Sequence, residues 1–216
     1  MSHITLVRHG QANTGARDEE SYDKLSPLGH QQAAWLGAHL RACGDTHARV
    51  YTGTLRRHIE TADSMGLCAA TRDPRLNEIE YFTLAELMQA QHGLAIPEER
   101  EGFVEHLPRV FTAWQNGEIA DPPETFEAFE TRVHAVLHEI GQGPGPAIAV
   151  TSGALISMVM RQVLDLDTRS MARVALAIMN TSVHRVHPIG PRLSPVLFNS
   201  VPHLDPPDRH YARTHL

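Results

Sequence analysis

The segment ITLVRHGQA, residues 4–12, joins a run of strand-forming residues to the cationic pair Arg8 and His9. Aliphatic and β-branched residues at positions 4–7 predict a short buried strand. Two interpretations of the pair are open at this point. Either Arg8 and His9 cap an ordinary strand, or the strand holds His9 at the mouth of a site.

Predicted strands and helices alternate after this segment. Ser26 and Pro27 form the N-cap and first-position pattern of a helix, and Thr54 and Gly66 are the expected cap and end of a later one. We expect helices at residues 25–43, 54–66, 123–141 and 154–166, and strands at residues 48–53, 147–153, 179–189 and 194–200. The alternation predicts an α/β fold, a three-layer α/β/α sandwich with a mainly parallel sheet.

The alternation is interrupted at residues 81–123, where we expect a helical cap insertion over one edge of the sheet. Helices are expected there at residues 84–93 and 103–117. Four aromatic residues either line a site under the cap or form its own small core, and we favour the second role: Tyr81, Phe82, Phe103 and Trp114. The length of 216 residues fits a single domain, residues 1–216.

The composition argues against several classes of protein. The chain is 42% hydrophobic and 20% charged, with a net charge of -6. Because the chain has no global positive field, we expect no nucleic-acid binding. No signal-peptide pattern and no membrane-spanning apolar run are present, and we expect a cytoplasmic protein without membrane contact. Cys43 and Cys68 match no metal or disulfide pattern. The fifteen histidines are scattered without an HExxH motif or a close His/Asp cluster, and we expect no metal site.

Distinctive residues follow three of the predicted strands. Arg8-His9-Gly10 follows the first strand, residues 53–57 follow the second, and Ser152-Gly153 follows the strand that begins at residue 147. Ligands of parallel α/β sheets bind beyond the carboxyl ends of the strands. We therefore expect these three segments to converge on one site.

The residue types in these segments suit the binding of a tetrahedral anion. Arg8 and Arg57 would surround the imidazole of His9, and guanidinium groups offer rigid, permanently charged donors to phosphate oxygens. A neutral imidazole can act as a nucleophile when an acceptor holds the proton on its other nitrogen. A carboxylic acid must protonate the leaving oxygen. Glu78 is our candidate for this role, and Glu80 is the competing carboxylate.

Four motifs in order resemble those of the histidine phosphatase superfamily, also called the phosphoglycerate mutase-like family. LVRHGQA is similar to the opening LxRHGxx motif, and LSPLGHQQA to the L-[ST]-x-x-G-x-x-Q-A helix. YTGTLRRHIETA is similar to S-x-L-x-R-A-x-[QE]-T-A, which makes Arg57 rather than Arg56 the motif arginine. LNEIE is similar to the L-x-E-I segment that contains Glu78. The resemblance extends over nearly the whole chain.

The resemblance implies a phosphomonoesterase that acts on a small phosphorylated molecule without a cofactor or metal. His9 would be phosphorylated and then attacked by water, Arg8 and Arg57 would hold the phosphoryl oxygens, and Glu78 would be the proton donor. Gln11 and Asn13 are either further substrate contacts or loop residues. Inorganic phosphate is the expected product and ligand, and a homodimer is compatible with the sequence.

The chain departs from the family pattern at Ser152, where a strand followed by [TS]-H-G-G is usual and histidine is expected. Loss of one preorganised donor typically costs about 100- to 1000-fold in turnover, so we expect a reduced rate. Either Ser152, Gly153 and the amides of the following helix bind the phosphate instead, or another imidazole replaces the missing one. The candidates for that imidazole are His184, His187 and His203.

A third explanation of Ser152 is a non-catalytic module, a pseudo-phosphatase that binds phosphorylated ligands. Retention of His9 together with Glu78 argues against it, because a pure binder has no use for a proton donor. A bisphosphoglycerate-dependent mutase is also disfavoured. Its ligand carries several charges and its motif usually reads RHGESxWN, whereas this chain has RHGQANTG and only two arginines in the insertion.

Overall fold

A computed structural model describes residues 2–16, 18–190 and 192–215. Its centre is a six-stranded sheet in the order β3-β2-β4-β1-β5-β6. The strands are β1 (Ile4–Arg8), β2 (Arg49–Thr52), β3 (Thr71–Arg72), β4 (Ala147–Thr151), β5 (Val183–Ile189) and β6 (Arg192–Ser200). The first four are parallel, and β5 and β6 add an antiparallel edge. The predicted mainly parallel α/β sheet is confirmed, although β3 was not predicted.

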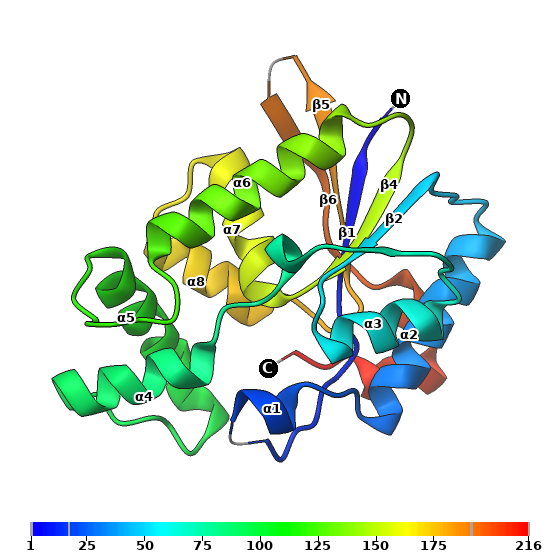
Figure 1. Cartoon of the computed structure of the whole chain (residues 1–216). Helices are drawn as coiled ribbons and strands as arrows, with labels where there is room; N and C mark the ends of the chain where they lie inside the picture. The colour runs from blue at the N-terminus through cyan, green and yellow to red at the C-terminus, as the bar shows by residue number, and fades with distance from the viewer. Residues whose placement is uncertain (1, 17, 191, 216) are drawn as a thin grey trace.

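Helices cover both faces of this sheet (Figure 1). They are α1 (Glu19–Tyr22), α2 (Pro27–Ala42), α3 (Arg56–Met65), α4 (Tyr81–His92), α5 (Phe103–Gln115), α6 (Phe126–Gln142), α7 (Gly153–Leu164) and α8 (Thr168–Ala177). Helices α2 and α3 lie on one face, and α6, α7 and α8 lie on the other. These three layers are the predicted sandwich, with α8 as a helix that the sequence did not predict.

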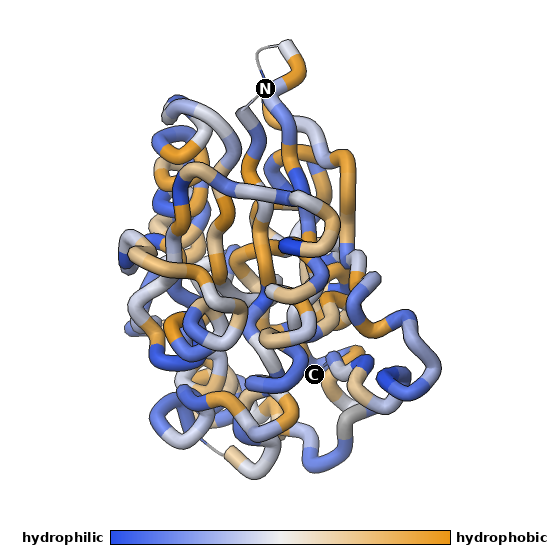
Figure 2. The backbone as a smooth tube through the Cα atoms, turned by 90° about the vertical axis from the view of Figure 1, so that its right-hand side faces the viewer, coloured by the Kyte–Doolittle hydropathy of each residue, from blue (hydrophilic) through white to orange (hydrophobic). Residues whose placement is uncertain are grey.

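The alternation of side chains along the central strands divides the interior into two cores. Ile4 and Leu6 of β1 pack with α6 and α7, whereas Val7 packs with α2 and α3. Successive residues of a strand point to opposite faces, so a strand that is apolar on both faces must be covered on both. Figure 2 shows hydrophobic residues along the central strands and the helix segments beside them. The rigid centre of this double core fixes the position of the strand ends.

The ends of the two helices on the first face differ in how they are capped. The Ser26 hydroxyl accepts a hydrogen bond from the Gly29 amide, as expected of the N-cap of α2. The Thr54 prediction is wrong, because Leu55 is the N-cap residue of α3 and its side chain makes no cap hydrogen bond. The Asp23 carboxylate accepts from the first amides of α3 instead, at 2.9 Å from the Arg56 nitrogen. A tertiary contact has replaced the local cap.

The segment that begins at Tyr81 forms α4 and α5 beside the sheet rather than an element of it (Figure 1). Trp114 is 3% exposed and its indole nitrogen donates to the Glu124 carbonyl at 2.7 Å. The Trp114 ring packs within 5.6 Å of Phe126 and Phe129, measured between ring centroids. Trp114 is therefore part of the main core together with α6, and not of a separate small core of the insertion as we expected.

Cys43 and Cys68 are both exposed and free. Among the helices of the described residues, none is both long enough and apolar enough to cross a membrane.

Candidate active site

The register of the sheet brings the three predicted strand ends together. Arg8 of β1 lies opposite Thr151 of β4, and the His9 amide donates to the Thr151 carbonyl at 2.9 Å. The Gly53 amide at the end of β2 donates to the Val150 carbonyl of β4 at 3.1 Å. His9, Gly53 and Ser152 are thus the first residues beyond three adjacent strands. This is the convergence that the sequence predicts.

The His9 side chain is held in one tautomer. Its Nδ1 lies 2.7 Å from the Gly10 carbonyl oxygen, and a carbonyl can only accept, so Nδ1 carries the proton. The Nε2 lone pair is left for chemistry. Burial lowers the pKa of His9 well below its usual value, and the nearby charges of Arg57 and Arg8 and the ring of His58 lower it further. His9 is therefore a neutral imidazole at physiological pH.

Both site arginines are buried but keep donors unused. Arg8 donates through Nη1 to the Ile178 carbonyl, and Arg57 donates through Nη1 to Asp23 at 3.0 Å. The Nε of each guanidinium is buried and has no hydrogen-bond partner among the described residues. Buried donors without a partner are costly unless a ligand satisfies them. The two guanidiniums beside a neutral imidazole form a site for an anion with several oxygens.

The backbone that carries the cationic pair is fixed by the loop before β5. The Thr181 amide donates to the Arg8 carbonyl at 3.1 Å, and the Asn180 side chain donates to the His9 carbonyl at 3.3 Å. Thr181 has a φ of 55°, the left-handed region that a β-branched residue rarely adopts. Such strain persists only where surrounding contacts over-determine it, which indicates that the position of His9 is tightly specified.

The two candidate carboxylates are placed differently. Glu78 accepts from the Ala154 amide in the first turn of α7 at 3.1 Å, so it lies beside the segment that begins at Ser152. Glu80 precedes α4 and accepts from the Thr83 hydroxyl at 3.3 Å. The geometry places Glu78 on the side of the strand ends and favours it over Glu80 as the proton donor.

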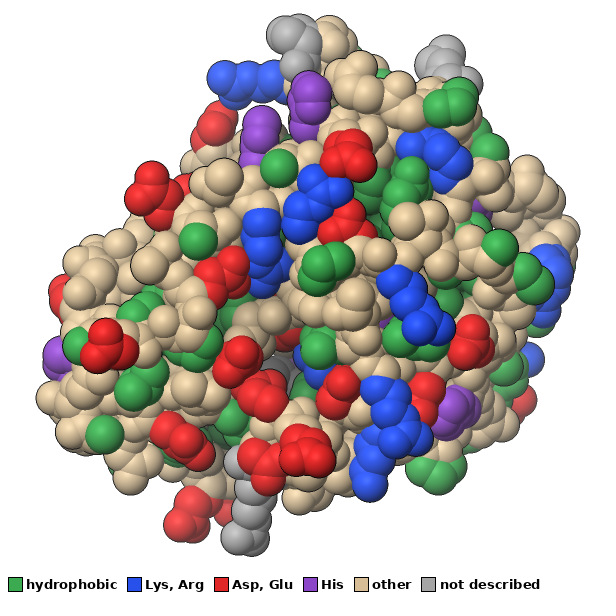
Figure 3. All heavy atoms as spheres, viewed as in Figure 1, with side chains coloured by type: hydrophobic (Ala, Val, Ile, Leu, Met, Phe, Trp, Pro, Cys, Tyr) green, Lys and Arg blue, Asp and Glu red, His purple; other side chains and the backbone are tan. Residues whose placement is uncertain are grey.

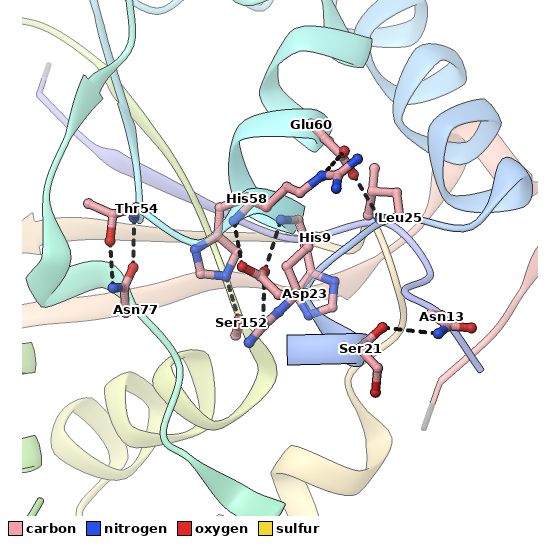
Figure 4. Close-up of polar contacts among 12 residues, drawn as sticks. His9, Asn13, Ser21, Asp23, Leu25, Thr54, His58, Glu60, Asn77 and Ser152 are labelled. Atoms are coloured by element: carbon pink, nitrogen blue, oxygen red, sulfur yellow. Dashed lines mark hydrogen bonds and ion pairs between the residues drawn. The ribbon is translucent and has the colours of Figure 1, made fainter. Parts of the chain in front are cut away.

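Gln11 and Asn13 use their side chains within the loop after β1. The Ser26 hydroxyl donates to Gln11 Oε1 at 2.8 Å. The Asn13 amide group donates to the Ser21 carbonyl at 3.0 Å (Figure 4). These contacts favour loop roles for both residues, and their contact with a substrate stays a prediction.

Two carboxylates of the site were missed by sequence analysis. Asp23 accepts from the Arg57 guanidinium at 3.0 Å and so orients it. Glu19 accepts from the Phe82 amide at 2.8 Å, and burial raises the pKa of Glu19 to about 7. Figure 3 shows acidic side chains gathered in the lower middle of the face, near the hollow between α1 and the α4–α5 segment. Neither residue lies in a motif, so no local signal marks them.

Aromatic rings enclose part of the site. The Arg57 guanidinium lies over the Tyr22 ring at 5.1 Å, and the centroids of the Tyr22 and His9 rings are 6.1 Å apart. Phe82 stacks edge-on against Tyr22 at 5.9 Å. The Tyr81 hydroxyl forms a hydrogen bond with His106 Nδ1, and the Tyr81 ring packs against Phe103. Phe82 is thus the aromatic residue of the insertion that reaches the wall of the site.

A histidine that sequence analysis did not consider lies against Ser152. His58 is fully buried, and its Nε2 is 2.6 Å from the Ser152 hydroxyl oxygen (Figure 4). The three histidines that we considered have other partners: His184 bonds to Ser182 and Asn199, His203 bonds to Thr181, and His187 stacks on His3. The sequence does contain one local sign of this contact, because residue 58 is histidine where the family pattern has alanine.

The expectation that histidine and aspartate form no close cluster is wrong. One ligand atom of each of His3, Asp45 and His47 lies within 4.8 Å of the others, near the amino end of β1 and away from His9. However, the Asp45 carboxylate already forms an ion pair with the Arg185 guanidinium. The fixed positive charge of Arg185, in direct contact with the Asp45 carboxylate, opposes binding of a cation there. We therefore interpret the cluster as a structural ion-pair network.

Fold and site together define an α/β protein with a buried imidazole between two buried guanidiniums at the ends of its parallel strands. The model of the histidine phosphatase superfamily (branch 1) matches residues 4–200. The chain therefore belongs to the histidine phosphatase superfamily, as the four motifs indicated.

Curated relatives and solved structures agree with this family. The chain is 31% identical over 195 residues to a probable phosphoglycerate mutase GpmB of Salmonella arizonae, covering 86% of this chain and 85% of that protein. A phosphoserine phosphatase mutant of Entamoeba histolytica, solved with phosphoserine, superposes with a TM-score of 0.70 at 16% identity, covering 94% and 100% of the two chains. A phosphoglycerate mutase of Bacillus anthracis gives a TM-score of 0.66 at 20% identity, covering 94% of each. The structural matches support the α/β fold.

Proposed function

We propose that the protein is a metal-independent phosphomonoesterase that acts on a small phosphorylated molecule through phospho-His9. The observation that carries the proposal is the state of His9. It is neutral, its Nδ1 proton is held by the Gly10 carbonyl, and it lies beside two buried guanidiniums with unused donors. This arrangement suits attack on phosphorus, because charge neutralisation and positioning supply most of the catalysis in phosphoryl transfer.

The proposed reaction has two displacement steps. In the first, the Nε2 lone pair of His9 attacks phosphorus, the P–O bond to the leaving group breaks, and Glu78 gives its proton to the leaving oxygen. In the second, Glu78 takes a proton from a water molecule whose oxygen attacks phospho-His9, and the P–N bond breaks. Inorganic phosphate leaves, and His9 and protonated Glu78 are restored. Arg8 and Arg57 bind the phosphoryl oxygens throughout.

The test compares wild type with His9→Ala on an aryl phosphate such as 4-nitrophenyl phosphate at pH 6 to 7, with chelator present. We expect hydrolysis by wild type only, and no effect of the chelator on its rate. Equal hydrolysis by both proteins would refute the proposed role of His9. His138→Ala is the matched control, because His138 is an exposed imidazole on α6.

A phosphoglycerate mutase is the second candidate, and the 31% identity to a protein of that name favours it. The mutase would retain the phospho-His9 step but return the phosphoryl group to a second hydroxyl of the substrate rather than to water. Incubation with 3-phosphoglycerate separates the two functions. Release of inorganic phosphate supports the phosphatase, and formation of 2-phosphoglycerate without release supports the mutase.

Ser152 motivates the remaining alternative, a non-catalytic module that binds phosphorylated ligands. This module predicts thermal stabilisation by inorganic phosphate without any phosphorylated protein. The cap role of residues 81–123, the cytoplasmic location and the homodimer stay predictions. Sedimentation equilibrium would test the homodimer directly.

A further inference from the structure

We propose that His58 and Ser152 act as a coupled pair that supplies the donor missing from the family pattern. In this pair, His58 is a positioning residue that orients the Ser152 hydroxyl toward a phosphoryl oxygen bound at His9. The inference rests on the proposed phosphatase function and adds to it a residue that no motif assigns. It also removes the conflict between an otherwise complete site and the absence of the second motif histidine.

The pair lies where a phosphate donor is needed. Ser152 directly follows Thr151, whose carbonyl accepts the His9 amide hydrogen, so Ser152 and His9 extend from adjacent strands. The centroids of the His58 and His9 rings are 5.8 Å apart. His58 also follows Arg57, which holds a guanidinium at the same site. Imidazole, hydroxyl and guanidinium thus border the space beside His9, as Figure 4 shows for the two histidines and Ser152.

The hydrogen bond between them assigns the protons. His58 Nε2 and the Ser152 hydroxyl oxygen are 2.6 Å apart, and both residues are fully buried. The other ring nitrogen of His58 has no partner among the described residues. An orphaned buried N–H is rarer than an under-satisfied acceptor, so we place the proton on Nε2. His58 then donates to Ser152, whose own O–H is left to donate to a ligand.

The local sequence makes room for this imidazole. A Cβ atom on Gly53 would lie 2.1 Å from His58 Nδ1, so only glycine fits beside the ring. A histidine at position 152 would likewise compete with His58 for the space around the Ser152 hydroxyl. We therefore infer that the family arrangement, alanine at 58 with histidine at 152, and the arrangement of this chain are alternative ways to supply one donor.

Four variants test the pair by steady-state hydrolysis of 4-nitrophenyl phosphate: His58→Ala, His58→Gln, Ser152→His, and the double variant with His58→Ala and Ser152→His. We expect His58→Ala to lower kcat by about 100-fold, the typical loss for one preorganised donor, with KM changed less. His58→Gln should recover about tenfold, because its amide nitrogen reaches the Nε2 position. Ser152→His alone should be no faster than wild type, whereas the double variant should exceed both single variants.

A purely structural role predicts a different result. If His58 only fills space, loss of activity would follow loss of thermal stability, and the double variant would be no better than its parents. Wild-type kcat in His58→Ala, or a tenfold gain in Ser152→His with His58 in place, would overturn the proposal. Should His58→Ala fail to fold, His58→Gln and the double variant still decide the question.

Failure of this inference can be distinguished from failure of the phosphatase function by the binding of inorganic phosphate. The pair should donate to bound phosphate whether or not catalysis follows. We expect the Kd of inorganic phosphate to rise about tenfold in both His58→Ala and Ser152→Ala, with His138→Ala unchanged. If the wild type is inactive but the Kd values change as expected, only the phosphatase function is refuted. Unchanged Kd values in both variants would refute the proposed pair.

Discussion

At the residue scale, the site depends on how burial and hydrogen bonding set the state of single side chains. The Gly10 carbonyl fixes the His9 proton on Nδ1, and desolvation with two neighbouring guanidiniums keeps the ring neutral. A protonated imidazole cannot act as a nucleophile. The same two cations oppose that protonation. A neutral imidazole between two guanidiniums is the state that the proposed attack on phosphorus requires.

The role of Glu78 predicts a dependence on the leaving group. Glu78→Gln should lower kcat for an alkyl phosphate by about 100-fold or more, the usual contribution of general acid catalysis. The loss should be much smaller for 4-nitrophenyl phosphate, because nitrophenolate leaves without protonation. Rates on the two substrates check this, with Glu80→Gln as the control. Equal losses on both substrates would contradict a role in leaving-group protonation.

At the element scale, close approach of backbones fixes the loop that carries His9. A Cβ on Gly29 in α2 would lie 2.1 Å from the Gln11 carbonyl oxygen, and a Cβ on Gly10 would lie 2.4 Å from the Gly29 carbonyl oxygen. Both clashes are with backbone, which cannot rotate away. The glycine of the LSPLGHQQA segment therefore lets α2 pack against the loop that carries His9, which gives this motif position a physical cause.

Gly29→Ala should destabilise the fold and reduce activity together, because α2 and the loop after β1 would have to separate. We expect a loss of about 1–3 kcal/mol, as for other overpacked sites, measured by urea unfolding. Gly141→Ala in α6 is the matched control, since its Cβ would meet only Ile4 Cδ1 at 3.8 Å. That variant should be neutral or up to about 1 kcal/mol more stable. The same change in both variants would contradict the packing argument.

Arg49 of β2 holds the turn that joins α6 to β4. Its guanidinium donates to the carbonyls of Ile140, Gly143, Pro144 and Gly145, at 2.7–3.1 Å. Arg49→Ala would leave these carbonyls to water, and we expect a loss of about 2 kcal/mol from the charged hydrogen bonds. Unfolding in urea checks the loss, with Arg192→Ala as an exposed control on β6. Wild-type stability would show that water replaces the guanidinium without cost.

At the scale of the whole molecule, several buried neutral histidines couple stability to pH. Burial lowers the pKa of His184 and of His203 to about 3, and lowers those of His9 and His58 well below the usual value. The unfolded chain then binds more protons than the folded one as the pH falls below about 6.5. The contribution of these histidines to stability is therefore fully present above that pH and is lost on acidification.

Each such histidine should contribute up to about 1.4 kcal/mol per pH unit to this loss. We expect the free energy of unfolding in urea to fall steeply between pH 7 and pH 5, with little change in the m-value. His203→Gln should flatten the slope, because it removes one of the groups that titrate only in the unfolded state. A pH-independent free energy over this range would contradict the assigned protonation states.

Local patterns predicted the sheet, most helices and the residues at the strand ends, because these depend on periodicity and on order along the chain. They did not predict contacts made across the fold. The cap of α3 comes from Asp23 rather than the adjacent Thr54, and the partner of Ser152 is His58, 94 residues earlier. Helix α8 was missed, although Asp167 caps it by accepting from the Ser170 amide. Partners distant in sequence leave no periodic signal.

Direct detection of phosphohistidine at His9 tests whether the protein acts through a covalent phosphorylated intermediate. Wild type and His9→Ala would be mixed with a labelled phosphomonoester, quenched within milliseconds to seconds, and analysed for phosphohistidine by peptide mass spectrometry under alkaline conditions. We expect acid-labile, alkali-stable phosphate on the peptide that contains residues 4–12 of wild type only. Turnover of the ester with no label on His9, or label on another residue, would contradict it.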